Sequence, residues 1–140
     1  MNDPLSAPLH GPTVLVVDDD AWMRSVLVDL LPAEGYKVEE ASDGASGIRL
    51  AKADRPDVVI LDLAMPEVSG VEVLRELKND SWTTNIPVII FSAYAAQLPA
   101  DCAPRAEAVI EKPIDLTDLI DQIGRVTRQE ARSALRGVAP

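Results

Sequence analysis

VVILDLAMPEVSG, residues 58–70, is the stretch that decides the fold. It opens with a short, continuous, β-branched apolar run, which is typical of a parallel strand buried on both faces of a sheet. We predict this strand at Val58–Leu63 and, because it is the most apolar run, expect it at the centre of the sheet. Asp62 interrupts the run near its end, and Ser69 with Glu72 three residues later forms a capping box that opens a helix. The stretch therefore predicts a buried strand, a loop and a helix, with a carboxylate at the strand end.

The same unit of strand and helix recurs along the chain. Further short strands are predicted at Thr13–Val17, Tyr36–Ala41, Pro87–Phe91 and Ala108–Ile110, and helices over residues 21–34, 44–53, 69–78 and after a cap at Asp115. Gly35 is expected to end the first helix, which Pro32 should kink or shorten. Pro99 and Pro104 limit residues 95–105 to a turn or two of helix. This alternation predicts an α/β fold, a doubly wound five-stranded parallel sheet with helices on both faces.

Length and composition exclude several classes of protein. A length of 140 residues fits one domain, and an apolar content of 47% indicates a folded chain. No apolar run approaches the ~20 residues that cross a bilayer, and the first dozen residues lack the basic and apolar regions of a secretory signal. One cysteine, Cys102, excludes an internal disulfide, so we expect a cytoplasmic protein. The single histidine, His10, disfavours mechanisms that need a histidine nucleophile, base or zinc cluster.

The charge of the chain is acidic but uneven. A net charge of −10 argues against a nucleic-acid surface, which would need a basic face. Residues 1–124 hold 9 Lys/Arg against 22 Asp/Glu, whereas residues 125–140 hold four Arg against one Glu. These arginines, at positions 125, 128, 132 and 136, share one helical face, which is either solvated or a docking stripe for an acidic partner or a second copy. We divide the chain into a flexible proline-rich leader (1–12), a domain (13–128) and a helical extension or linker (129–140).

Polar residues follow the predicted strands at one edge of the sheet. Asp18 and Asp19 follow the first strand, Asp62 ends the third, Ser92 follows the fourth and Lys112 the fifth. Ligands of an open α/β sheet bind beyond the carboxyl ends of its strands, and the first and third strands are neighbours, so we expect the three aspartates in one pocket. Carboxylates this close repel unless a cation joins them, and oxygen ligands in a small acidic pocket favour Mg²⁺. With Lys112 completing the charge balance, such a pocket can accept an anionic phosphoryl group, to which Ser92 could donate a hydrogen bond.

Together these motifs resemble the receiver domains of two-component response regulators, of the type seen in chemotaxis regulators. The resemblance covers about residues 13–128 and rests on VLVVDDD at 14–20, VVILDLAMPEVSG at 58–70, VIIFSA at 88–93 and VIEKP at 109–113. It implies a flavodoxin-like sheet with strand order 2-1-3-4-5. It also implies a signalling switch that takes a phosphoryl group from a histidine kinase, a phosphotransfer protein or a small phosphodonor, and then binds a downstream protein partner.

The resemblance further implies a role for each motif residue. Asp62 would be the phosphoacceptor, and Asp19, Asp62 and the backbone carbonyl of Ala64 would bind Mg²⁺, or Mn²⁺, with Asp18 acting through a water. Lys112 would pair with the phosphoryl group, and Ser92 would turn toward it on activation. Ala93, Tyr94, Val109 and Pro113 would take part in switching and tuning, and Lys112-Pro113 would be a cis peptide.

Two features depart from the family pattern. Val109 stands three positions before the lysine, where family members often carry an aromatic switch residue. Coupling from Ser92 to an output surface would therefore run through another residue or be weak. Residues 95–105 predict an irregular fourth helix, on the surface that the family uses, with the fifth strand and last helix, to recognise partners. Homodimerisation through the last helix stays open.

We expect this switch not to be an enzyme, because its phosphotransfer and self-dephosphorylation serve to change its conformation. Two other functions remain as alternatives. A haloacid-dehalogenase-like phosphatase carries its nucleophile in a D-x-D after the first strand, which Asp18 and Asp20 mimic. Such phosphatases also need a further acidic pair and a Thr soon after the D-x-D, and the sequence lacks both. The other alternative is a pseudo-receiver, a binding module of the same fold without phosphorylation. Retention of all five pocket positions argues against it.

Overall fold

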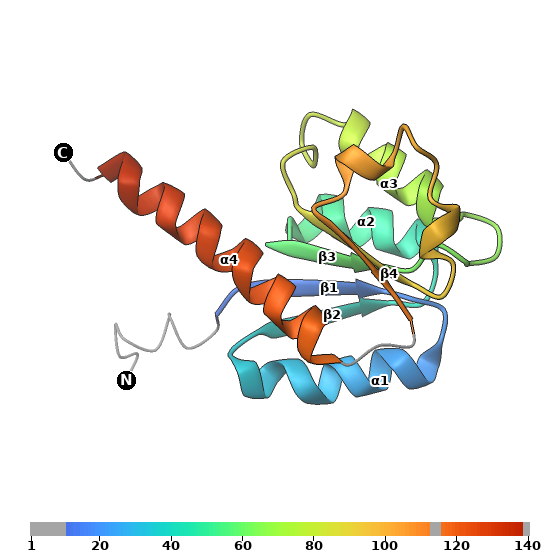
Figure 1. The fold of residues 1–140 in the computed structure, drawn as a ribbon, viewed down its shortest axis with the longest axis horizontal. Helices are drawn as coiled ribbons and strands as arrows, with labels where there is room; N and C mark the ends of the chain where they lie inside the picture. Colours follow the sequence, from blue (N-terminus) through green and yellow to red (C-terminus); the bar gives the residue numbers. More distant parts are fainter. Residues whose placement is uncertain (1–10, 113–115, 139–140) are drawn as a thin grey trace.

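The computed structural model describes residues 11–112 and 116–138, with side chains described as far as Arg128. Strands and helices alternate along the chain (Figure 1). The strands are β1 (Thr13–Val17), β2 (Lys37–Ala41), β3 (Val58–Leu61), β4 (Val88–Ser92) and β5 (Ala108–Glu111). The α-helices are α1 (Ala21–Leu30), α2 (Gly44–Asp54), α3 (Gly70–Asn79) and α4 (Leu116–Val138). Among the described residues, 3-10 turns occur at η2 (Leu31–Glu34), η3 (Ala95–Gln97) and η4 (Ala103–Arg105).

The strands form one parallel sheet in the order β2-β1-β3-β4-β5. This order and direction confirm the doubly wound sheet and the flavodoxin-like topology predicted from the sequence. β3 lies at the centre, as its apolar run predicts, and all of its residues are buried. Because β1 and β3 are hydrogen-bonded neighbours, with Val17 opposite Leu61, the residues that follow the two strands emerge side by side.

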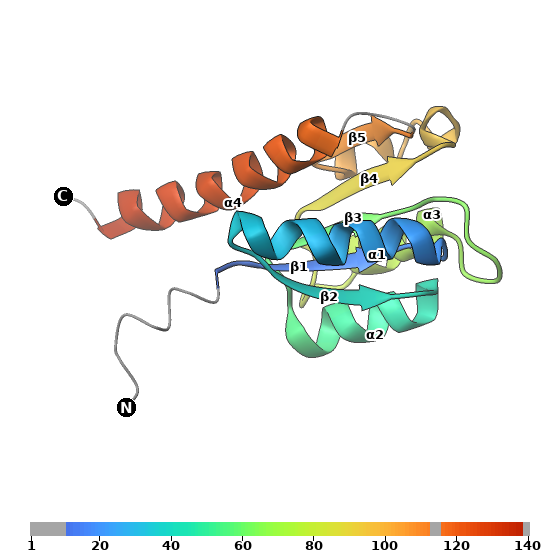
Figure 2. The same cartoon turned by 90° about the horizontal axis from the view of Figure 1, so that it is seen from below.

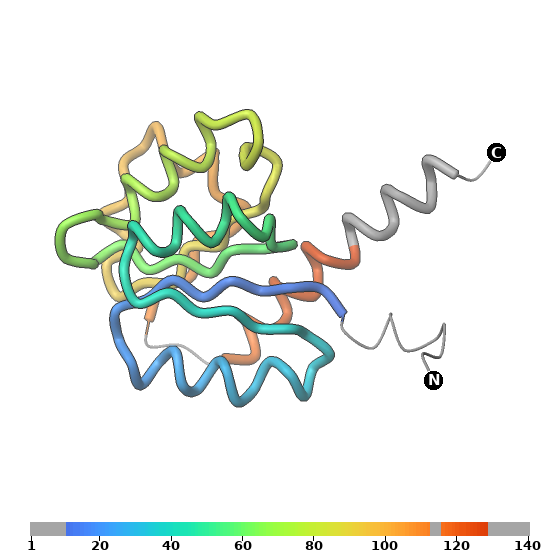
Figure 3. Tube along the Cα trace, turned by 180° about the vertical axis from the view of Figure 1, so that it is seen from behind, coloured from blue at the N-terminus to red at the C-terminus, as the bar shows by residue number. Residues whose placement is uncertain are grey.

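Helices cover both faces of the sheet and enclose two cores (Figures 1 and 2). The core under α2 and α3 includes Leu15, Val17, Leu61, Val73 and Leu77. The core under α1 and α4 includes Val16, Leu27, Ile60, Leu119 and Ile123. The chain trace shows α2 and α3 together on one face and α1 on the other (Figure 3). Successive side chains of β1 and β3 point to opposite faces and pack alternately in the two cores. Both faces of these strands are therefore buried, and polar residues are tolerated only where the strands end.

Helix ends follow the local sequence signals. The first helix stops at Leu30, short of the predicted residue 34, because Pro32 cannot continue the helical hydrogen bonds. A 3-10 turn carries the chain on to Gly35, which has a φ of 96° that suits glycine. At α3, Ser69 and Glu72 form the predicted capping box.

The chain between β4 and β5 forms only the two 3-10 turns η3 and η4 in place of an α-helix, as its prolines predict. Cys102 lies in this segment and is fully buried. β3 ends at Leu61, two residues before the predicted boundary, so Asp62 lies just beyond the strand rather than inside it.

Some sequence predictions lie outside the described residues. They are the leader as far as His10, the Lys112-Pro113 peptide and the role of Pro113, the Asp115 cap, and the side chains of Arg132 and Arg136. No helix in the described part of the chain is long and apolar enough to cross a membrane.

Candidate functional site

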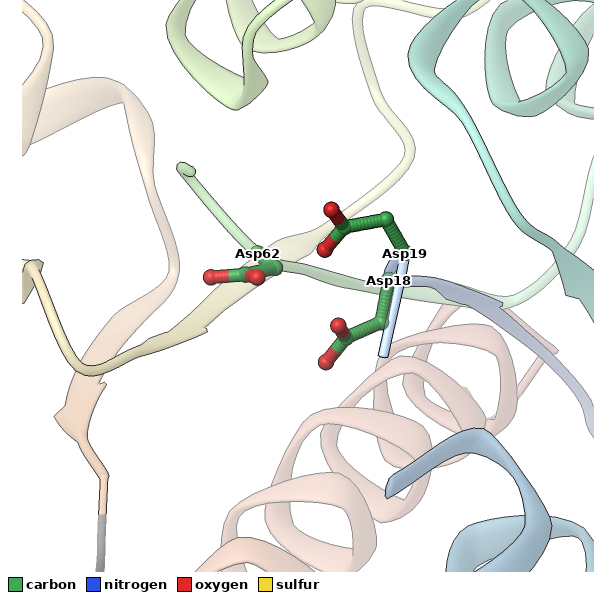
Figure 4. Close-up of side chains that lie close together, drawn as sticks. All are labelled: Asp18, Asp19 and Asp62. Atoms are coloured by element: carbon green, nitrogen blue, oxygen red, sulfur yellow. The ribbon is translucent and has the colours of Figure 1, made fainter. Parts of the chain in front are cut away.

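Three carboxylates meet at the carboxyl ends of β1 and β3. Asp18 and Asp19 follow β1, and Asp62 follows β3 (Figure 4). One carboxylate oxygen from each lies within 4.8 Å of the other two. Asp18 and Asp62 are buried, with 2% and 7% of their surfaces exposed, whereas Asp19 is exposed. The structure thus brings together the three aspartates that the sequence predicted in one pocket.

Backbone contacts fix this acidic pocket, which we define as Asp18, Asp19, Asp62 and Lys112. The Asp62 N–H donates to the Val17 carbonyl at 3.0 Å, and the Asp18 N–H donates to the Ala41 carbonyl at 3.1 Å, so the sheet hydrogen bonds continue one residue past each strand. Gly70 packs closely on Asp62: a Cβ at Gly70 would lie 2.1 Å from the Asp62 carbonyl oxygen. Only glycine allows this approach of α3 to the strand end.

Lys112 reaches the pocket from the end of β5. Its Nζ donates a hydrogen bond to Asp18 Oδ2 at 2.7 Å and lies 3.9 Å from Asp62 Oδ2. All three side chains are largely buried, with exposed fractions of 14%, 3% and 9% for Lys112, Asp18 and Asp62. The ammonium group therefore bridges two carboxylates and is held more closely by Asp18 than by Asp62. The structure therefore places Lys112 in the pocket.

The pocket leaves negative charge uncompensated. Burial raises the pKa of the Asp18 carboxyl, although hydrogen bonds from Lys112 and the Asp20 N–H and the charge of Lys112 act in the opposite direction. Asp62 Oδ1 is buried and has no hydrogen-bond partner among the described residues. A buried acceptor without a partner is costly, and a second cation beside three carboxylates would satisfy it. The all-oxygen donor set therefore fits a hard divalent cation such as Mg²⁺.

The remaining predicted residues lie around the rim of the pocket. Ser92 ends β4, is fully buried, and its Oγ accepts a hydrogen bond from the Tyr94 N–H at 3.1 Å. The described residues show no hydrogen bond between Ser92 and Asp62. Ala64, Ala93 and Tyr94 are exposed, Tyr94 to 49%. Val109 is 43% exposed on β5, so no described element fully covers the position where an aromatic residue is usual in the resembled family.

A family model described as "Response regulator receiver domain" matches residues 14–124, most of the chain. The chain belongs to the response regulator receiver domains. This receiver domain is part of two-component signalling, in which such domains act as signalling switches that respond to phosphorylation rather than as enzymes in the usual sense. The haloacid-dehalogenase-like alternative is not favoured.

Named relatives agree with this assignment. The polar-differentiation response regulator DivK of Brucella anthropi is 34% identical over 113 residues, which cover 79% of this chain and 92% of DivK. A receiver domain from Clostridium thermocellum has a TM-score of 0.76 at 28% identity, covering 86% of this chain and 97% of that one. The response regulator TrrA of Thermotoga maritima, solved in complex with Mg²⁺-BeF, has a TM-score of 0.75 at 27% identity, covering 82% and 98%.

Two residues of this receiver domain lie next to the pocket and have structural roles. Asp20 caps α1: its Oδ1 accepts hydrogen bonds from the N–H groups of Trp22 and Met23 at 3.0 and 3.3 Å. The second aspartate of the phosphatase-like D-x-D is therefore a helix cap in this structure. Arg24, which the sequence analysis did not single out, bonds the backbone of the Asp18 loop. No sequence pattern marks this contact, because its partner is a backbone carbonyl.

Proposed function

We propose that Asp62 is the phosphoacceptor of this switch. One of its carboxylate oxygens attacks the phosphorus of a phosphohistidine on a histidine kinase or phosphotransfer protein, or of a small phosphodonor. A new O–P bond forms, the old bond to phosphorus breaks, and the leaving group keeps the electron pair of that bond. The observation that carries the proposal is the buried, unpartnered Oδ1 of Asp62 beside two more carboxylates and a lysine.

The other pocket residues would handle the charge of the reaction. Lys112 moves between Asp18 and the phosphoryl oxygens, a change supported by its present distances of 2.7 Å to Asp18 and 3.9 Å to Asp62. Asp18, Asp19, Asp62 and the carbonyl of Ala64 would hold Mg²⁺, for which Mn²⁺ can substitute, and the complex of the Thermotoga relative with Mg²⁺-BeF supports this cation. Bound there, the ion neutralises charge that develops on the transferred group.

Ser92 would report the phosphorylation. Its hydroxyl leaves the Tyr94 N–H and donates to the phosphoryl group, which pulls on the segment that follows β4. Ala93 and Tyr94 would adjust the access of water to the phosphoaspartate, and Val109 the coupling to the surface around β5 and α4. That surface would bind the downstream partner, and Arg125 and Arg128, both exposed on α4, suit an acidic protein or a second copy. Division of the chain at residues 12 and 128 and a cytoplasmic location stay predictions.

Mass spectrometry after incubation with acetyl phosphate and Mg²⁺ tests the proposal. We expect the wild type to gain one phosphoryl group, and Asp62→Asn and a chelator to abolish the gain. Glu67→Gln, which changes an exposed acid of the same loop, serves as the matched control and should react normally. A wild type that gains no phosphoryl group would indicate a pseudo-receiver. Release of phosphate from a general substrate, lost in Asp18→Asn but kept in Asp62→Asn, would indicate the phosphatase.

A further inference from the structure

Arg24 holds both ends of the loop that carries the pocket aspartates. The loop, residues 18–20, connects β1 to α1. The backbone N–H of Arg24 donates to the Asp20 carbonyl at 3.0 Å, which fixes the end of the loop at the helix. Its guanidinium Nη1 donates to the Asp18 carbonyl at 2.6 Å, which fixes the end at the strand. The N–H bond forms with any residue at this helix position, so the specific contribution of Arg24 is the guanidinium bond to the Asp18 carbonyl, next to Asp19.

The guanidinium is itself held in place. Its Nε bonds Glu40 Oε1 at 3.2 Å, so Arg24 links α1 to the edge strand β2 as well as to the loop. Only 17% of the Arg24 side chain is exposed, against 50% for Glu40. A planar guanidinium with two bonds in fixed directions keeps its orientation better than a flexible ammonium group.

Asp19 depends on this backbone more than its neighbours do. Lys112 and the Asp20 N–H hold the Asp18 carboxylate at 2.7 and 2.9 Å, and packing against Gly70 holds the Asp62 backbone. The Asp19 side chain is exposed, and no side-chain hydrogen bond of Asp19 occurs in the described part of the chain. The orientation of the peptide between Asp18 and Asp19 therefore decides where the Asp19 carboxylate lies.

We infer that Arg24 is a positioning residue for the cation: through the Asp18 carbonyl it holds Asp19 in the orientation that binds Mg²⁺. The inference rests on the proposed function of the pocket. Charge alone predicts the opposite effect, because a guanidinium near the pocket repels Mg²⁺ and its removal would tighten binding. A loss of affinity on removal of this positive charge cannot come from the charge itself, so the direction of the change separates a positioning role from an electrostatic one.

Isothermal titration of Mg²⁺ into the unphosphorylated chain tests the inference without any phosphodonor. We expect Arg24→Met to weaken Mg²⁺ binding about tenfold, the lower end of what residues that orient metal ligands contribute. Should this variant unfold too readily to titrate, Arg24→Gln takes its place with the same expected loss, since its amide is too short to reach the carbonyl. Unchanged or tighter binding overturns the role of Arg24.

Two control variants separate positioning from ordinary stabilisation. Glu40→Gln weakens the ion pair of Arg24 but leaves the Asp18 carbonyl bond, and Leu27→Ala destabilises α1 from its fully buried face. Both should bind Mg²⁺ within about twofold of the wild type, and a tenfold loss in either overturns the inference. A wild type that binds no Mg²⁺ overturns the proposed function and this inference together, whereas normal wild-type binding with an unaffected Arg24→Met overturns only the latter.

Discussion

The acidic pocket contrasts with the connecting segment, which we define as residues 93–107. The pocket aspartates follow β1 and β3, and the connecting segment begins at the end of the neighbouring strand β4. In the pocket, sheet hydrogen bonds extend past β1 and β3, and Lys112 bridges Asp18 and Asp62. The connecting segment contains two isolated 3-10 turns, and Tyr94 within it is half exposed. Just after this segment, Val109 is 43% exposed. One region is held by hydrogen bonds to the sheet, and the other is an irregular chain over it.

This difference matches the different demands of phosphoryl transfer and of partner recognition. Phosphoryl transfer requires charged groups at fixed positions, because a misplacement of about 1 Å costs about two orders of magnitude in rate. Recognition of a partner requires only that the partner fits the surface. The pocket residues therefore match the family pattern, while the connecting segment and Val109 depart from it. Ser92 lies between the two regions, at the end of a buried strand and before the first 3-10 turn.

The largest effect is expected inside the pocket. Lys112→Met should slow the gain of a phosphoryl group from acetyl phosphate about 100-fold or more, because the variant loses the cation that is proposed to pair with the transferred oxygens. Mass spectrometry over time measures this rate. Lys52→Met removes a half-buried lysine that lies outside the pocket and pairs with Glu76 and Asp80, and should leave the rate unchanged. A Lys112→Met rate equal to that of the wild type would remove the lysine from the chemistry.

A smaller effect is expected at the boundary between the two regions. Ser92→Ala should slow phosphorylation about tenfold, the equivalent of one hydrogen bond to a charged group. The variant should also lose the change in amide hydrogen exchange that phosphorylation produces in residues 93–107. Ser92→Thr keeps the hydroxyl and should retain both properties. If Ser92→Ala phosphorylates more slowly but keeps the exchange response, Ser92 serves the chemistry and not the communication.

The smallest effect is expected on the far side of the boundary. Val109→Ala should leave the phosphorylation rate within about twofold and the free energy of unfolding within about 0.5 kcal/mol, because the side chain is 43% exposed. Its neighbour Ile110 points to the opposite face, is 8% exposed and packs in the core under α1 and α4. Ile110→Ala should therefore cost about 2–5 kcal/mol in chemical denaturation. Equal losses in the two variants would mean that Val109 is covered in solution.

The sequence predicted the sheet and the pocket because both follow from strand order. Once the apolar run at β3 is central and next to β1, Asp62 and Asp18 have to emerge together. It did not predict that Lys112 bonds Asp18 more closely than Asp62, since that choice depends on about 1 Å of side-chain placement. The contact of Arg24 left no pattern either, because its partner is a backbone carbonyl that every residue possesses. Prolines predicted a turn or two of helix over residues 95–105, but not that these turns would be of the 3-10 type or where each would lie.

The unpartnered Oδ1 of Asp62 also ties the folding of this chain to its ionic surroundings. A buried oxygen without a hydrogen-bond partner lowers the stability of the native state. A ligand that binds this oxygen only in the folded form shifts the equilibrium toward folding. At a free cation concentration of 100 times the dissociation constant, this linkage is worth about 2.7 kcal/mol. The midpoint of unfolding should thus rise with Mg²⁺, so the stability of the folded protein reports on the same carboxylate that is proposed to be phosphorylated.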